Sequence, residues 1–182
     1  MEEVKQIFKE IKNWNAAGYD GISIRTLDCL PESALHALTY SINQSFVMGE
    51  FPVCLKSAVV VSLFKARDMG DPSNFRPISL LSTLSKVIEK IVKKRAMIFL
   101  ENNRILNPFQ FGFLSGKNTD DAIFALLHQV YLNINGGEAV AAIFCDFSKA
   151  FDCVDHGVLL RKLRHYPRFA RFAPSCYLEE RR

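Results

Sequence analysis

The stretch AVAAIFCDFSKAFDCVDHGVLLRKL, residues 139–163, decides how the rest of this sequence is interpreted. Its first seven residues, Ala139 to Cys145, are all apolar. They predict a strand covered on both faces, because a strand covered on one face alternates apolar with polar residues. Asp146 follows at once, so we expect it where this strand reaches the edge of its sheet, a common position for a site.

Three carboxylates gather around the end of the predicted strand, Asp146, Asp152 and Asp155. An ionised carboxylate at a strand end is costly unless a cation or hydrogen-bond donors meet it. Mg²⁺ takes one or two protein carboxylates and leaves its other positions to water and phosphate, so one interpretation is a magnesium site. The alternative is a hydrogen-bonded strand-end aspartate followed by acids that cap the helix predicted around residues 158–163.

The segment CDFSKAFDCVDHGVLLRKL resembles the first palm motif of reverse transcriptases from non-LTR (LINE-type) retrotransposons. The match is long and contiguous. It implies that Asp146 is catalytic and binds both magnesium ions of the complete enzyme. It also implies that Phe151 lies under the sugar of the incoming nucleotide and disfavours a 2′-hydroxyl.

The composition of the 182 residues is that of a globular protein, with 49% hydrophobic residues, 23% charged residues and a net charge of +4. There is no apolar run of membrane-spanning length and no signal-peptide pattern at the start, so we expect a soluble intracellular chain, cytoplasmic or nuclear, without a membrane partner. The five cysteines form no C-x-x-C pair. We expect buried, reduced thiols without a disulfide partner.

Apolar periodicity predicts helices over residues 2–13, 32–48 and 83–101, with Gly49 closing the second. The loop WNAAGYDGIS, residues 14–23, must turn sharply or approach something closely at its glycines. It resembles the K-A-A-G-P-D-G-I segment of the same reverse transcriptases, with Tyr19 where proline is usual.

Residues 57–64, SAVVVSLF, predict a strand, and Lys65 and Arg67 follow it at the rim of a hairpin. Basic side chains there suit a triphosphate, and a solvated hairpin tip is the alternative. The continuation Arg-Pro-Ile-Ser-Leu-Leu, residues 76–81, resembles the fingers motif of the family. The resemblance implies that Lys65 and Arg76 hold the phosphates of the incoming nucleotide, and Arg67 is a further candidate.

The predicted helix 83–101 carries a stripe of four lysines opposite its apolar face. We call these residues the basic stripe: Lys86, Lys90, Lys93 and Lys94. The basic stripe suits the phosphate backbone of a nucleic acid, and an ordinary solvated helix face is the alternative.

The aromatic loop NPFQFGF, residues 107–113, resembles another signature of the family, with Leu114 in place of arginine and Asn118 in place of serine. Its rings suit either stacking on bases or core packing, and we favour packing. The helix that follows is expected to turn its apolar residues inward, among them Ile123, Leu126, Leu127, Val130 and Tyr131. Asp120 and Asp121 look like a polymerase's double aspartate, but acids in a helix's first turn favour the helix dipole.

The resemblance covers residues 14–182 in the family's order. It implies an α+β fold, with the fingers and first palm strand of a right-hand polymerase and helices packed on a small mixed sheet. We expect an N-terminal helical extension over residues 1–55, fingers over 56–135 and the start of the palm over 136–182. The family's later Tyr-x-Asp-Asp motif is not in this sequence.

The function implied is that of an RNA-directed DNA polymerase acting on an RNA template, a DNA primer and deoxynucleoside triphosphates. Two-metal phosphoryl transfer needs more carboxylates than Asp146, so we expect this chain by itself to be inactive. The alternative is a catalytically dead remnant that still binds nucleic acid. An aspartyl-phosphate enzyme is disfavoured, because Ser148 occupies the position where a D-x-D motif needs aspartate.

Overall fold

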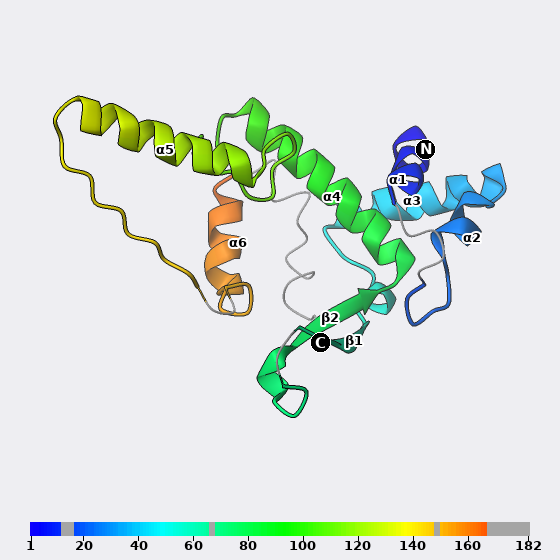
Figure 1. The fold of residues 1–182 in the computed structure, drawn as a ribbon. Helices are drawn as coiled ribbons and strands as arrows, with labels where there is room; N and C mark the ends of the chain where they lie inside the picture. The colour runs from blue at the N-terminus through cyan, green and yellow to red at the C-terminus, as the bar shows by residue number, and fades with distance from the viewer. Residues whose placement is uncertain (12–16, 66–67, 148–149, 167–182) are drawn as a thin grey trace. The chain divides into compact units, whose positions relative to one another are not determined.

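The computed structural model describes residues 1–11, 17–65, 68–147 and 150–166, shown as coloured ribbon in Figure 1. The chain divides into two compact units. Unit 1 comprises Met1–Phe99 with the chain from Asp155 onward, and unit 2 comprises Leu100–Val154.

Helices dominate unit 1. They are α1 (Glu2–Glu10), α2 (Ile24–Asp28), α3 (Glu32–Met48), most of α4 (Thr83–Asn102) and α6 (His156–Arg164). The bounds predicted for α3 and α4 are confirmed to within one residue, and Gly49 ends α3 with a left-handed φ of 69°. The first helix ends at Glu10, three residues before the predicted end.

The core of unit 1 is made where α1, α2, α3 and α4 turn their apolar faces to one another. Eleven buried residues form it: Val4, Ile7, Phe8, Ile24, Leu27, Leu35, Ile42, Phe51, Val87, Ile88 and Ile91. The apolar spacing in the sequence therefore identified the inner faces of α1, α3 and α4 correctly.

The only sheet among the described residues is an antiparallel hairpin of β1 (Ala58–Phe64) and β2 (Phe75–Leu81), joined through the short 3-10 helix η2 (Pro72–Asn74). Another 3-10 helix, η1 (Val53–Leu55), precedes it. The five central residues of each strand are exposed. The α+β class is confirmed, but the sheet is antiparallel rather than mixed.

The strand predicted at residues 139–145 is not formed. These residues are extended and exposed, and Ile143 keeps 90% of its surface accessible. A strand needs a hydrogen-bonded neighbour, and in the described ranges the backbone hydrogen bonds include none between this segment and another strand. Asp146 therefore follows an unpaired, exposed segment instead of a buried strand.

Unit 2 contains the last turn of α4, the aromatic loop, α5 (Thr119–Asn135) and the extended segment. The expectation of an inward apolar face on α5 is wrong, because Ile123, Leu126, Leu127 and Tyr131 are all exposed. The described residues of unit 2 include no second layer of secondary structure against which this helix can bury a face. Packing was also expected of Phe109 and Phe113, which are about four-fifths exposed.

Four cysteines also differ from expectation. Cys29, Cys54, Cys145 and Cys153 are free and exposed, so the prediction of buried thiols is wrong for them, and Cys176 lies outside the described residues. Cys29 ends α2 and Cys54 lies in η1, so both are at surface turns.

Candidate nucleotide and nucleic-acid surfaces

The β1–β2 hairpin places two predicted phosphate ligands on one face. Leu63 pairs with Arg76 across the strands, and the backbone N–H of Lys65 donates to the carbonyl of Asn74 at 2.8 Å, which continues the ladder one step past β1. Side chains of directly paired residues, and of residues two apart along a strand, share a face. Lys65 and Arg76 are therefore diagonal neighbours on the same face.

Both cations of this face are exposed to solvent. The opposite face carries Phe64 and Phe75, whose ring centroids lie 5.5 Å apart across the hairpin. One face of the hairpin end is thus aromatic and the other cationic. Arg67, the further candidate, lies outside the described residues.

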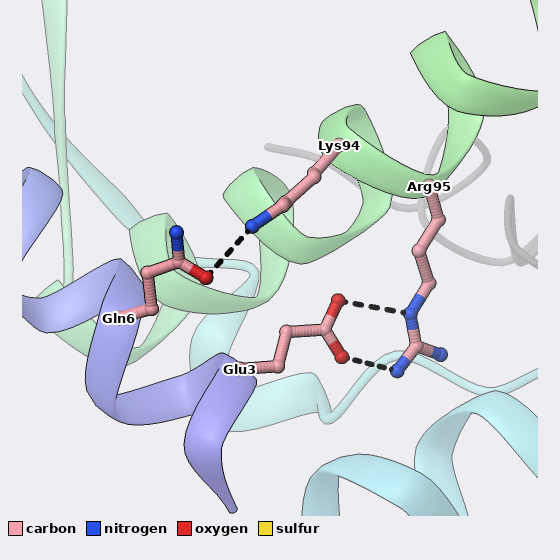
Figure 2. A network of polar contacts seen from close by, with 4 residues as sticks. All are labelled: Glu3, Gln6, Lys94 and Arg95. Carbon is pink, nitrogen blue, oxygen red and sulfur yellow. Dashed lines mark hydrogen bonds and ion pairs between the residues drawn. The ribbon is translucent and has the colours of Figure 1, made fainter.

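The basic stripe of α4 is divided by its contacts with α1. Lys94 donates from Nζ to the Gln6 side-chain oxygen at 3.1 Å, and Lys90 forms an ion pair with Glu10 at 3.4 Å (Figure 2 shows the Lys94 contact). The two other lysines of the basic stripe, Lys86 and Lys93, lie seven residues apart on the same side of the helix. The basic stripe is therefore not a uniform free surface.

Arg95 is a second contact between the same two helices, and the sequence interpretation overlooked it. Its Nε and Nη2 donate to the two carboxylate oxygens of Glu3 at 3.3 and 2.7 Å (Figure 2), and its guanidinium lies 5.1 Å from the ring centre of Phe46 in α3. A signal was available, because Arg95 falls at helical spacing from the buried Ile88 and Ile91. A cation on the apolar side of a helix requires a partner.

The bidentate contact changes the acidity of Glu3. Hydrogen bonding from Arg95, reinforced by the charges of Arg95 and Lys94, holds the pKa of the Glu3 carboxyl below its ordinary value of 4.5, although partial burial acts in the opposite direction. Glu3 is therefore ionised at neutral pH, and α1 presents its negative charge to α4.

Asp146 and Phe151 both belong to unit 2, and both are exposed. The ring of Phe151 meets the ring of Phe113, from the aromatic loop, edge to face with centroids 5.8 Å apart. No group of three or more potential metal ligands of the histidine, cysteine, aspartate or glutamate type gathers anywhere in the described ranges. Asp146 is thus an exposed carboxylate that belongs to no such group.

Two of the other carboxylates near these motifs, Asp155 and Asp121, belong to helix caps, whereas Asp152 is exposed. Asp155 accepts from the backbone N–H of Val158 at 2.8 Å and begins α6. Asn118 and Asp121 form a reciprocal capping box at the start of α5, with both hydrogen bonds at 2.9 Å. The prediction that Asp121 begins a helix is confirmed, and the same contact gives Asn118 a structural role.

Lys117 is a further residue whose role the sequence interpretation missed. Its Nζ donates to the carbonyls of Pro108 and Gln110 at 2.8 and 3.0 Å and lies 4.8 Å from the ring centre of Phe111. These three contacts close the aromatic loop on itself. The signal is weak in the sequence, because nothing in the spacing of a lone lysine predicts which carbonyls it meets.

Known proteins place the chain in a family. Residues 65–177, more than half of the sequence, match the family described as reverse transcriptase (RNA-dependent DNA polymerase), and the chain belongs to that family. The matched region contains Lys65, Arg76, the basic stripe, Asp146 and Phe151.

Several proteins of mobile elements are similar to this chain. The whole chain is 30% identical to the RNA-directed DNA polymerase from mobile element jockey and 31% identical to the probable RNA-directed DNA polymerase from transposon BS, both of Drosophila melanogaster. A third relative is the retrovirus-related Pol polyprotein from type-1 retrotransposable element R1 of Bradysia coprophila. It is 31% identical to this chain across an alignment that covers 90% of the chain. The chain spans about a fifth of the length of each of the first two relatives and 16% of the third.

Within the part of the chain that the structure describes, no helix combines the length and the apolar character needed to cross a bilayer.

Proposed function

We propose that this chain provides the fingers and the beginning of the palm of a retrotransposon RNA-directed DNA polymerase, over residues 56–135 and 136–182. In the complete protein, a DNA primer paired with an RNA template extends by one deoxynucleotide at a time. The primer 3′-oxygen forms a bond to the α-phosphorus of the triphosphate, the bond to the β-phosphate oxygen breaks, and pyrophosphate leaves with the displaced charge.

The observation that carries this proposal is the shared face of Lys65 and Arg76 on an exposed hairpin. A triphosphate offers several anionic oxygens in a row. Arg76 supplies a planar fork that meets two of them, and Lys65 supplies a point charge on a flexible stem. Side chains at diagonal positions lie roughly 7–8 Å apart at their bases, a span that lets both reach one triphosphate.

Reverse transcriptases as a family use a divalent metal, and Asp146 fits one ligand position. A carboxylate oxygen is the donor that Mg²⁺ prefers, and an exposed one leaves the rest of the coordination sphere open to water and phosphate. When bound, two such ions stabilise the charge on the attacking and leaving oxygens. Asp146 cannot hold both in working geometry alone, and Asp155 is engaged as a helix cap, so this chain requires further carboxylates for catalysis.

The remaining residues complete the proposed substrate contacts. Phe151 lies under the sugar of the incoming nucleotide and disfavours ribose there. The basic stripe runs beside the template–primer duplex, and its side away from α1 has the greater share of phosphate contacts, because α1 already engages Lys90 and Lys94.

The proposal is tested by measuring Mg²⁺–dATP binding to the purified chain by titration calorimetry. Losing a charge-assisted contact weakens binding by roughly tenfold or more, so Arg76→Gln and Lys65→Gln should each reduce affinity by about that factor. Arg25→Gln, which removes the same charge from an exposed position on α2, should leave affinity unchanged. Equal effects of all three variants would mean that the hairpin contributes only non-specific positive charge, and would contradict the proposal.

A further inference from the structure

The β1–β2 hairpin is part of unit 1, and burial in this region lies beside the ends of its strands rather than at their centres. The centres of both strands are exposed, whereas Lys56, two residues before β1, and Ser82, directly after β2, are buried. We call these two positions the roots of the hairpin. Because the strand centres do not pack on the core, the direction of the hairpin depends on the contacts that hold its roots.

One loop forms hydrogen bonds to residues near both roots. In residues 17–23, the Tyr19 hydroxyl donates to the carbonyl of Cys54, two residues before Lys56. On the other side, the Thr83 hydroxyl donates to the carbonyl of Ile22, directly after Ser82. The loop lies beside the base of the hairpin in Figure 1, so a single segment spans the space between the two roots.

Gly18 brings this loop against the second root at backbone distance. A Cβ atom at position 18 would lie 2.5 Å from the Cα of Ser82 and 2.8 Å from both the Leu81 carbonyl oxygen and the Ser82 nitrogen. These are backbone atoms that cannot rotate away, so only glycine permits the approach. Of the two alternatives predicted for this glycine-containing loop, a sharp turn or a close approach, Gly18 makes the close approach.

The loop is itself a fixed structure. Ala17 and Ser23 form an antiparallel bridge, and the Gly21 N–H donates to the Gly18 carbonyl at 3.2 Å. Ser23 then caps α2, whose Ile24 is fully buried in the core. A continuous series of contacts therefore joins the core to the hairpin. It runs from the core to α2, then to the loop, and then to both roots.

We infer that residues 17–23 are a positioning element that sets the direction of the β1–β2 hairpin and with it the place of Lys65 and Arg76. This inference rests on the proposed function for its consequence, because the hairpin presents those two residues to the triphosphate. Tyr19 is the residue that makes the contact specific to this chain. The proline usual at this position in the resembling segment has no hydroxyl to donate.

The test compares Tyr19→Phe with Tyr40→Phe in the 182-residue chain. Both variants remove one tyrosine hydroxyl, and Tyr40 lies exposed on α3. Hydrogen exchange by mass spectrometry should be about threefold to tenfold faster in the hairpin peptides of Tyr19→Phe, because a side-chain hydrogen bond contributes that factor to local opening. Exchange in α1 and α3 should stay at the wild-type rate. Gly18→Ala should have the larger effect on the same peptides.

The affinity for Mg²⁺–dATP is measured on the same variants. Faster hairpin exchange together with weaker binding in Tyr19→Phe supports the inference. Hairpin exchange equal to that of Tyr40→Phe overturns it, and so does faster exchange with wild-type affinity. If the wild-type chain binds no triphosphate, the proposed binding of the triphosphate by Lys65 and Arg76 is wrong. Hydrogen exchange still shows, independently of binding, whether the loop holds the hairpin.

Discussion

The Glu3–Arg95 contact makes part of the stability of α1 depend on pH. The pKa of the Glu3 carboxyl is lowered in the folded chain, so its contribution is present above the ordinary value of 4.5 and is lost as pH falls through the lower folded value. Glu3→Gln should reduce the free energy of unfolding at pH 7 by a few tenths to about 1 kcal/mol, as expected for a partly exposed pair. Urea titrations at pH 7 and at steps below pH 4.5 measure this.

Glu2 provides the matched control, because it lies in the same first turn and carries the same charge. Glu2→Gln removes the same interaction with the helix dipole without removing the contact to Arg95. The wild-type and Glu3→Gln curves should converge in acid while the Glu2→Gln difference stays small throughout. A Glu3→Gln difference that persists unchanged at the lowest pH would show that the pair is not the cause.

Residues whose roles are set by near neighbours in the chain were predictable, and those set by distant partners were not. Asp121 was assigned to a helix start from its position after Thr119, and its capping box confirms this. Arg95 instead depends on Glu3, 92 residues away. Its spacing marks it as unusual on an apolar face, but no local rule names its partner.

The part of α4 that lies in the core contributes more to stability than the same face two turns further along the helix. Ile91 is buried in the core at 1% exposure, whereas Ile98, two turns later, is 50% exposed. Removing one methyl group from a buried isoleucine costs about 0.5–1.5 kcal/mol, so Ile91→Val should lower the free energy of unfolding by that amount. Ile98→Val should change it by less than about 0.5 kcal/mol. Denaturant titration of both variants is the measurement, and equal losses would contradict the placement of the core.

The division of the basic stripe predicts unequal roles for its two halves in nucleic-acid binding. Lys86→Gln with Lys93→Gln should reduce the slope of log affinity against log salt by up to about two units for a primer–template duplex, roughly one for each lost phosphate contact. Lys90→Gln with Lys94→Gln removes the same charge, but these side chains already contact α1 and should change the slope less.

Fluorescence anisotropy of a labelled primer–template at several salt concentrations distinguishes the outcomes. The two double variants have identical net charge, so a difference between them reports position rather than total charge. Identical slopes in both would mean that the stripe acts only as diffuse charge, and an unchanged slope in both would remove the basic stripe from the binding surface.

The element that the sequence interpretation predicted wrongly is the strand at residues 139–145, which the structure does not form. Helices α3 and α4 were predicted to within one residue because their hydrogen bonds and caps lie within the segment itself. A strand depends on a partner segment, which an apolar run does not specify. The exposed face of α5 follows the same rule, since a helix forms from local contacts but buries a face only where a second layer exists.

Taken as a whole, the molecule combines a helical core in unit 1 with surfaces that carry much of the proposed chemistry, in both units. The motifs and their order led to the family, and the resemblance to that family implied the α+β class. The grouping of Lys65 with Arg76 follows from hairpin register. The attachment of that hairpin through residues 17–23 could not be predicted, because its two hydrogen bonds join residues 35 and 61 positions apart.

The final prediction concerns the activity of the complete 182-residue chain. Two-metal phosphoryl transfer requires carboxylates on both ions, yet in the described ranges Asp146 belongs to no group of three or more potential metal ligands, and Asp155 is engaged as a helix cap. The purified chain with Mg²⁺, a primer–template and radiolabelled dATP should incorporate no nucleotide above the level of its Asp146→Ala variant. Parallel calorimetry should still detect Arg76-dependent binding of dATP, which separates a missing catalytic ligand from a misfolded chain. Incorporation by the wild type that disappears in Asp146→Ala would mean that this chain supplies the remaining metal ligands itself.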